Sequence, residues 1–328
     1  MVPILKSLFP HANVSMLLRS YTKDVASGAE GLSEILAYDH NGKLKSFFEM
    51  LRELRLGRYD LAIIAFPRFR ISLLLWLAGI PARLGTGYRW YSFLFNLRVF
   101  EHRKVGQKHE SEYNLGLLKG LGVEPPVPPK PAVRFSEEDR LVALALMHEL
   151  GIQKDDPWII LHPGSGGSAR DWKAQNFGAL ATHLAEKGFT VAVTGGPGED
   201  SLVAEVVKCS NGGGVPVVNR LNLKQLAALI SFARLFVSNS TGPLHIASAV
   251  GTPVIGFYPD IPACSAVRWG PLTDRRVVFI PNRKNCPLCI GGECRSDLCM
   301  DQIRVEDVAK AALKLAARSR NLQPIETN

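Results

Sequence analysis

The sequence of 328 residues predicts an α/β protein of two domains, each built on a parallel sheet. Three observations support this fold class. Apolar runs of strand length alternate with amphipathic helical patterns in both halves of the chain. A proline-rich stretch, residues 122–131, separates the halves because it suits neither a central strand nor a helix interior. In the second half, two strand-like runs end in glycine- or serine-rich turns before a helix, which presents backbone N–H groups to phosphate.

The first half, residues 1–130, is expected to form one α/β domain. Residues 1–10 have a helical apolar pattern, whereas an α/β domain more naturally begins with a strand. Strand-like runs lie at 14–18, 35–38, 61–66 and 83–85. Helical patterns lie at 44–56, 72–78 and 111–121.

The second half, residues 131–328, predicts a doubly wound domain. Its first helix, 136–150, begins at an N-capping Ser136 with Asp139 three residues later, a weaker relative of the capping box. Strands are predicted at 158–161, 189–193, 215–218, 235–237 and 253–257. The helices between them are predicted at 174–187, 199–208, 223–231 and 242–250.

Composition indicates a globular protein that favours anionic partners, because its formal net charge is +9. The longest apolar stretches, such as 71–80, are too short to span a bilayer, and no signal-peptide pattern opens the chain. We therefore expect a cytoplasmic location. The positive charge would also suit nucleic acid, but we recognise no nucleic-acid-binding module and expect no such partner.

Two turns are the candidate phosphate-binding sites. In the first, the backbone would line a diphosphate while Arg170 neutralises its charge; the alternative is a flexible loop. In the second, hydroxyls and the helix N-terminus would contact phosphate; the alternative is ordinary helix capping. The residues concerned are Gly164, Ser165, Gly166, Gly167 and Arg170 in the first turn, and Ser240, Thr241 and Gly242 in the second.

Four of the six cysteines lie close together with the spacing C-x2-C-x4-C-x4-C: Cys286, Cys289, Cys294 and Cys299. In a chain without a secretory signal they are better interpreted as thiols or metal ligands than as disulfides. Four convergent thiolates could hold a structural zinc ion or an iron–sulfur cluster. No cofactor is otherwise required.

Several motifs together resemble the ADP-heptose:lipopolysaccharide heptosyltransferase family, glycosyltransferase family 9. They are His162-Pro163-Gly164, Trp172 with Phe177, the turn at 194–199, the run 239–247, the Gly251-Thr252-Pro253 tripeptide, and His109-Glu110 before Asn114. The resemblance implies the GT-B fold, two Rossmann-like domains with parallel sheets facing across a cleft. It also implies inverting transfer of a sugar from a nucleotide-diphosphate donor to a lipopolysaccharide core acceptor. The C-terminal helix is a candidate to pack back on the first domain.

The resemblance assigns further donor contacts. Glu199 would face the ribose and Leu221 the adenine; the alternatives are a carboxylate at a helix N-terminus and a core residue. His245 would approach the donor phosphate, or serve a structural role. Many relatives carry Lys in place of Arg170 and Asp in place of Ser240, so charge is kept at one position and lost at the other.

One departure concerns the catalytic base. Family members begin with a strand and a Gly-Asp loop that supplies the presumed catalytic aspartate, and this sequence shows neither. We expect either a truncated chain or a relative whose chemistry is changed or lost. Asp24 and Asp60 lie in the same half but match no family position, so the base is unknown.

Basic and aromatic residues crowd the first half: Arg68, Arg70, Arg83, Arg89, Arg98, Arg103 and Lys104, with Trp76, Trp90 and Tyr91. They would suit an anionic glycolipid acceptor at the cytoplasmic face of an inner membrane, and the alternative is a solvated basic face. The predicted function is therefore heptosyl transfer in lipopolysaccharide core assembly. The alternatives are another GT-B activity, such as nucleotide-sugar epimerisation, and a non-catalytic nucleotide-sugar or metal-binding protein.

Overall fold

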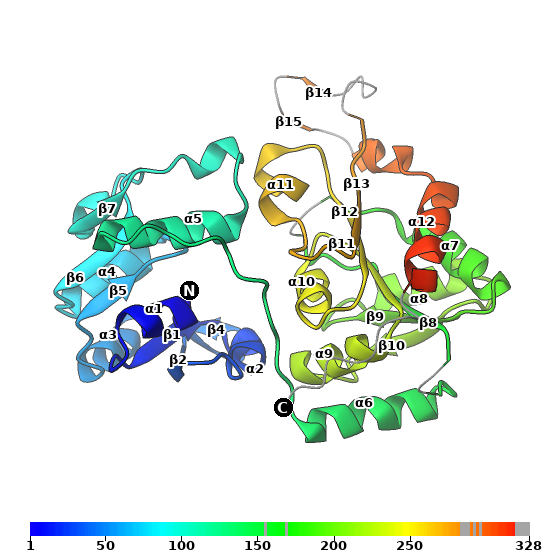
Figure 1. Ribbon diagram of the computed structural model, residues 1–328, viewed down its shortest axis with the longest axis horizontal. Coiled ribbons are helices and arrows are strands. Elements are labelled where there is room, and N and C mark those ends of the chain that lie inside the picture. Colours follow the sequence, from blue (N-terminus) through cyan, green and yellow to red (C-terminus); the bar gives the residue numbers. More distant parts are fainter. Residues whose placement is uncertain (154–155, 168–169, 283–288, 291–292, 295–296, 319–328) are drawn as a thin grey trace. The chain divides into compact units, whose positions relative to one another are not determined.

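The computed structural model describes residues 1–328 except 154–155, 168–169, 283–288, 291–292, 295–296 and 319–328 (Figure 1). The chain divides into two compact units, Met1–Pro129 and Lys130–Asn328. This division lies one residue from the boundary expected from the proline-rich stretch.

The first unit contains short strands and helices in alternation. Its elements are α1 (Val2–Leu8), β1 (Val14–Leu18), α2 (Lys23–Ala26), β2 (Leu32–Ala37), β3 (Asp39–His40), β4 (Lys43–Leu44), α3 (Phe47–Leu56), β5 (Leu61–Ile63), α4 (Phe69–Leu77), β6 (Ala82–Thr86), β7 (Leu97–Val99) and α5 (Glu110–Gly116). Short 3-10 helices include Ser92–Leu94 and Leu117–Leu121. The predicted helix 111–121 is therefore an α-helix that continues as a 3-10 helix.

The described strands of this unit form two parallel sheets and one antiparallel hairpin, β3 with β4, instead of the single sheet expected. β1 pairs with β2, and β5, β6 and β7 pair in that order. Side chains of β1, β2 and β5, among them Leu17, Leu36 and Ala62, nevertheless pack on one apolar cluster with α3 and α4. The two sheets are thus joined by a shared core, without hydrogen bonds between β1 and β5 among the described residues.

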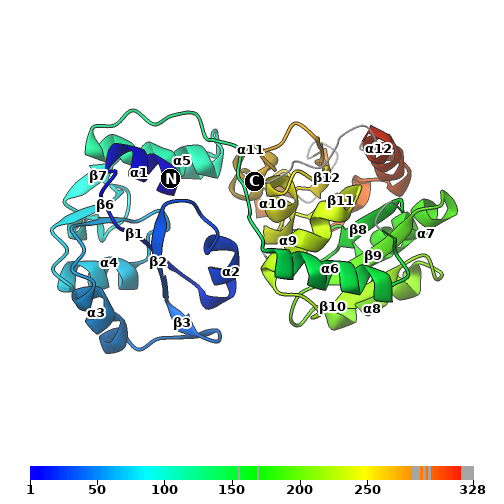
Figure 2. The same ribbon diagram turned by 60° about the horizontal axis from the view of Figure 1, so that its bottom comes forward.

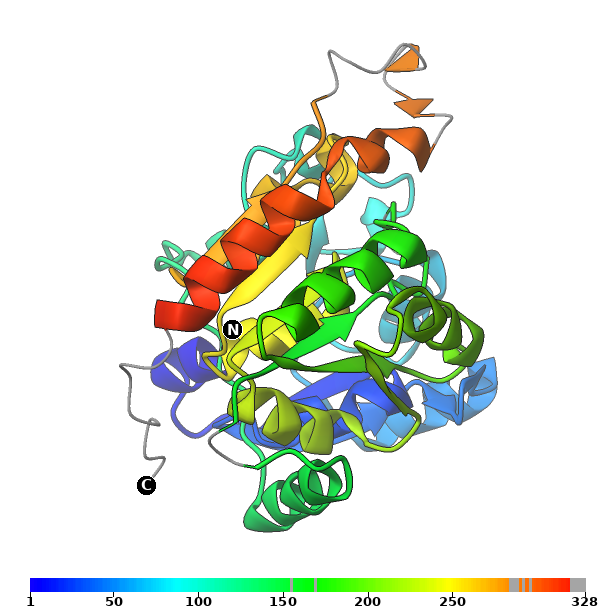
Figure 3. The same cartoon turned by 90° about the vertical axis from the view of Figure 1, so that its right-hand side faces the viewer.

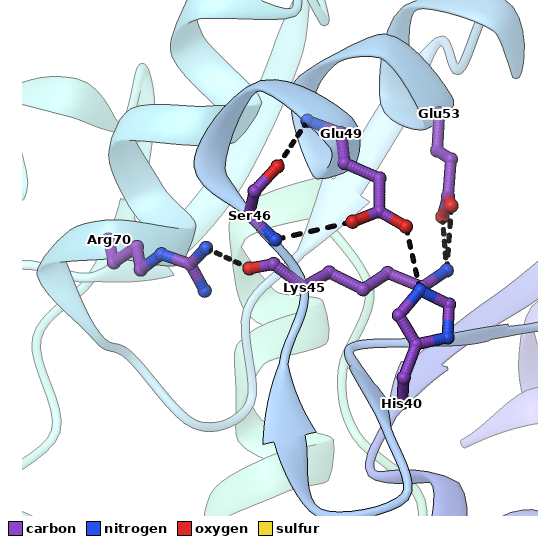
Figure 4. Close-up of polar contacts among 6 residues, drawn as sticks. All are labelled: His40, Lys45, Ser46, Glu49, Glu53 and Arg70. Carbon is purple, nitrogen blue, oxygen red and sulfur yellow. Dashed lines mark hydrogen bonds and ion pairs between the residues drawn. The ribbon is translucent and has the colours of Figure 1, made fainter.

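A polar network joins the β3–β4 hairpin to the start of α3 (Figure 4). Ser46 and Glu49 form a capping box at the helix N-terminus, and Glu49 also lies 2.7 Å from the His40 ring. The pKa of Glu49 is lowered, first by the hydrogen bond from His40. Lys45 pairs with Glu53 at 2.6 Å, while its carbonyl accepts from Arg70. Local polar contacts therefore fix this helix, which the sequence predicted to begin slightly earlier, at residue 44.

The second unit is the doubly wound domain. Its elements are α6 (Glu137–Glu149), β8 (Trp158–His162), α7 (Ala174–Glu186), β9 (Thr190–Gly195), α8 (Asp200–Cys209), β10 (Val215–Val218), α9 (Leu223–Phe232), β11 (Leu235–Asn239), α10 (Gly242–Ala249), β12 (Val254–Phe257), α11 (Ala266–Trp269), β13 (Arg276–Phe279), β14 (Cys289–Ile290), β15 (Glu293–Cys294) and α12 (Val305–Arg318). Every predicted strand and helix of this half is present, with ends shifted by at most two residues.

Six strands form one parallel sheet in the order β10-β9-β8-β11-β12-β13. The edge strand β13 was not predicted from sequence. All residues of β8 and β11 are buried, as expected for central strands covered on both faces. The strand order reverses between β8 and β11, which is where such sheets bind ligands.

Helices cover both faces of this sheet. Side chains of α7, α8 and α12 share one large buried cluster with the strands, and α12 runs beside α7 (Figure 3). On the other face α9 packs against α10, and α6 packs outside α9 (Figure 2). α12 thus contributes Val308, Ala312 and Ala316 to the core of its own unit.

Candidate functional site

The predicted site residues gather at the carboxyl ends of adjacent strands. β8 ends at His162, immediately before the first turn, and β11 ends at Asn239, immediately before the second. These two strands are direct neighbours, with Ser238 opposite His162. The two turns therefore lie side by side at the reversal of strand order.

Asn239 ties the first turn to the end of β11. Its side chain is fully buried. The amide oxygen accepts from the backbone N–H of Trp172 at 2.8 Å, and the amide nitrogen donates to the carbonyl of Pro163 at 2.7 Å. One side chain thus holds both ends of the segment that carries Gly164 to Arg170.

Trp172 anchors the far end of the same segment. Its indole stacks on Phe257, with 4.4 Å between ring centroids, and donates to the carbonyl of Ile303 at 3.0 Å. Phe177, the partner in the sequence motif, contacts the same indole edge-on. Trp172 and Phe177 are therefore core residues whose packing positions the turn.

Glycine is favoured at three positions of the first turn. Gly166 and Gly167 have φ of 58° and 75°, in the left-handed region that other residues rarely adopt. Both are exposed, with nothing within 4 Å of where a Cβ would lie. At Gly164 a Cβ would collide with the carboxyl group of Glu199. Such exposed backbone is open to a phosphate group.

A buried histidine, His162, lies at the start of the first turn. His162 is buried, and its Nδ1 lies 2.9 Å from the Thr194 hydroxyl while its Nε2 lies 3.8 Å from Glu199. Burial lowers the pKa of His162 from 6.5 to about 4, against the opposing attraction of Glu199. His162 is therefore neutral at physiological pH and is held as an uncharged hydrogen-bonding group.

Glu199 is directed toward this turn in the described structure. It is the N-cap residue of α8, but its side chain makes no capping hydrogen bond to the helix among the described residues. One carboxylate oxygen instead accepts from the backbone N–H of Gly196 at 2.8 Å. Glu199 thus connects the ends of β8 and β9, and its predicted contact with a ribose stays a prediction.

The second turn leads into α10. Thr241 is the N-cap residue, and its hydroxyl makes no capping hydrogen bond among the residues that the structure describes. The alternative that Thr241 caps the helix through its side chain is therefore wrong. Ser240 is buried and hydrogen-bonds Tyr258, whose pKa is raised by burial. The helix N-terminus at Gly242 is exposed and suits an anion.

The remaining predicted donor contacts lie at the same edge of the sheet. Arg170, Leu221 and His245 are half-buried and follow β8, β10 and β11 respectively. Ser165 is buried within the first turn. Their roles in binding stay predictions.

The cysteine segment lies largely outside the described residues. The backbones of Cys289 and Cys294 are paired opposite each other in the β14–β15 hairpin, and Cys299 is buried in the core of the second unit. Cys286 lies outside the described residues. Where side chains are described, no group of three or more possible ligands is placed to hold a metal ion.

Sequence reasoning overlooked His162, Thr194 and Asn239 as site residues, although all three stand in the quoted motifs. The available signal was their position, since each follows a predicted strand by one or two residues. No helix in the described part of the chain is long and apolar enough to span a membrane.

Comparisons with known proteins identify the family of the chain. The sequence profile of glycosyltransferase family 9 (heptosyltransferase) matches residues 47–299. Lipopolysaccharide heptosyltransferase 3 of Escherichia coli strain K12 is 26% identical over 291 residues, covering 85% of this chain and 82% of that protein.

Solved structures share the fold. A glycosyl transferase family 9 structure from Veillonella parvula DSM 2008 has a TM-score of 0.82 at 21% identity and covers 97% of this chain and 92% of its own. The E. coli ADP-heptose LPS heptosyltransferase II has a TM-score of 0.76 at 19% identity, with 97% and 94% covered. The expected GT-B fold is therefore confirmed. The profile match spans most of the chain, so the protein belongs to glycosyltransferase family 9, the heptosyltransferases, and is a glycosyltransferase.

Proposed function

We propose that the protein transfers a heptose, with inversion, from ADP-heptose to a lipopolysaccharide core acceptor. The observation that carries the proposal is the pair of turns at the ends of β8 and β11, at the reversal of strand order. Exposed glycine backbone on one side and a helix N-terminus on the other suit the two phosphates of a nucleotide-diphosphate donor. ADP-heptose and lipopolysaccharide are taken from the name of the E. coli structural neighbour.

In this mechanism the second unit binds the donor and stabilises the departing diphosphate. A carboxylate base removes the proton from an acceptor hydroxyl, whose oxygen attacks the anomeric carbon as the bond to the diphosphate breaks. Negative charge grows on the leaving group, so the dipoles of both turns and the Arg170 guanidinium lower the barrier. The base is not assigned.

The acceptor proposed is an anionic glycolipid, and the place of reaction is the cytoplasmic face of the inner membrane. The positive net charge of the chain supports an anionic partner. Epimerisation of a nucleotide sugar is the enzymatic alternative. Nucleotide release that depends on added acceptor supports transfer, whereas acceptor-independent conversion of the donor sugar supports the alternative.

Arg170→Ala tests the donor site directly. Loss of one charged hydrogen bond should weaken binding of the nucleotide-diphosphate donor by roughly 1.5–3 kcal/mol, measured by calorimetric titration with ADP. Arg140→Ala is a matched control, because Arg140 lies on α6 and its guanidinium stacks over the Phe232 ring. Equal ADP affinity in both variants would show that Arg170 does not bind the diphosphate.

We also propose that the four-cysteine segment holds a structural zinc ion or an iron–sulfur cluster. Four thiolates are a donor set that suits either, and the opposed backbone positions of Cys289 and Cys294 support the idea. Metal analysis of the purified protein should find a stoichiometric metal that is lost in Cys289→Ser. Equal metal content in Cys209→Ser, a control outside the segment, is expected. A metal-free wild-type protein purified without chelator would reject the proposal.

A further inference from the structure

The first unit has one segment of unusual charge. Residues 61–100 contain five arginines and no aspartate, glutamate or lysine. Arg70 and Arg83 are occupied, since both donate to backbone carbonyls. Arg68 and Arg89 are exposed, and neither guanidinium makes an ion pair among the described residues. The segment therefore carries positive charge that no acidic residue of the same segment neutralises.

Exposed aromatic rings gather at the carboxyl ends of the same three strands. Phe66 and Phe69 follow β5, Tyr88, Trp90 and Phe93 follow β6, and Phe100 follows β7. Because β5, β6 and β7 are adjacent and parallel, these ends lie at one edge of the sheet. We call the six residues the aromatic rim. Phe66, Trp90 and Phe93 are 67%, 73% and 64% exposed.

Contacts between the loops order the aromatic rim. Phe69 stacks on Trp90 with 4.8 Å between centroids, which joins the loops after β5 and β6. Tyr88 meets Phe100 edge-on at 5.6 Å, which joins the loops after β6 and β7. Arg68 lies over the Phe66 ring, 4.5 Å from its centroid. Single apolar residues scattered over a surface are normal. The aromatic rim differs from them because its exposed rings contact one another and lie beside exposed arginines.

We propose that the aromatic rim docks the protein on the surface of an anionic bilayer. The charge of the segment complements acidic headgroups, and four of the six rings are phenylalanines, which lack a polar atom to satisfy in water. Trp90 and Tyr88 are of the type enriched at the membrane interface. The inference rests on the proposed function for its biological reason, because the proposed acceptor is a membrane glycolipid.

The test is co-sedimentation of the full chain with vesicles of phosphatidylglycerol and phosphatidylcholine, and with vesicles of phosphatidylcholine alone. We expect binding only to the anionic vesicles, weakened by salt. Arg68→Gln with Arg89→Gln should lower the partition coefficient by roughly 25-fold, about fivefold for each charge. Phe66→Ala with Phe93→Ala should lower it by roughly tenfold, while the Phe69–Trp90 stack stays intact.

Two control variants carry changes of the same kind elsewhere in the first unit. Phe48→Ala removes a ring that is 80% exposed on α3, and Arg52→Gln with Arg58→Gln removes two charges on α3 and the turn before β5. Both should bind anionic vesicles like the wild type. Near-ultraviolet circular dichroism checks that every variant is folded.

Other outcomes overturn the inference. Absence of vesicle binding, equal binding to both vesicle types, or equal loss in rim and control variants would each do so. Self-association in light scattering that the Phe66/Phe93 variant abolishes, without vesicle binding, would make the aromatic rim an interface between copies. Sedimentation needs neither donor nor turnover, so a protein that binds vesicles without transferring heptose rejects the proposed function and keeps this inference.

Discussion

Replacing Asn239 by alanine is expected to lower the free energy of unfolding by about 2–4 kcal/mol. The substitution leaves the N–H of Trp172 and the carbonyl of Pro163 without the partner that Asn239 supplies in a buried place. It also releases both ends of the first turn, so affinity for ADP should fall at least roughly tenfold in the folded protein. Urea unfolding gives the first quantity, and calorimetric titration gives the second.

Asn96→Ala is the matched control for this prediction. Asn96 makes the same pair of bonds, because its amide oxygen accepts from the N–H of Arg83 and its amide nitrogen donates to the carbonyl of Pro81. It is exposed and lies in the first unit, so water replaces the lost partners at a smaller cost. ADP affinity that is unchanged in Asn239→Ala would show that Asn239 does not position the turn.

The second unit was predictable because its strands are long and buried. The runs Trp158–Leu161 and Leu235–Val237 are apolar throughout and are followed by turn residues, so the apolar pattern and the turn signals agree. The edge strand Arg276–Phe279 was missed. It starts with an exposed arginine and is only half-buried, so its apolar pattern is weaker.

The first unit was harder to predict because its strands are short. Asp39–His40 and Lys43–Leu44 pair as a hairpin of two-residue strands, too short to show a period. The strand Leu97–Val99 is also too short to show a period. The predicted strand 61–66 ends at Ile63, since Phe66 and Pro67 belong to the following loop. Whether strands share one sheet depends on pairing between distant segments, which local pattern does not encode.

The site was predictable in position and less so in its internal contacts. The position of the two turns could be predicted because each follows an apolar strand, and the carboxyl ends of parallel strands share one edge of the sheet. Sequence could not reveal that Asn239 reaches back to Pro163 or that Glu199 lies against Gly164, since each contact joins residues far apart in the chain. Tertiary structure alone brings these groups together.

The buried histidine below the first turn should make stability depend on pH. The folded pKa of His162 is about 4 and the ordinary value is 6.5. Between these values the unfolded chain binds a proton that the folded chain does not, so the free energy of unfolding falls as pH falls. The full loss from this group is about 3 kcal/mol, complete below the folded pKa and absent above 6.5. His162→Asn should remove this component, measured as the difference between urea-unfolding curves at a series of pH values.

Glu199→Gln gives the opposite result from His162→Asn and so separates the two causes of the pKa shift. The charge of Glu199 raises the pKa of His162 against the effect of burial. Without that charge the folded pKa falls further, so the loss of stability on acidification should grow and extend to lower pH. Parallel pH curves for wild type and His162→Asn would mean that His162 is not a buried neutral group. A smaller pH dependence in Glu199→Gln would mean that the carboxylate does not stabilise the protonated ring, and the two side chains would then act on the turn independently.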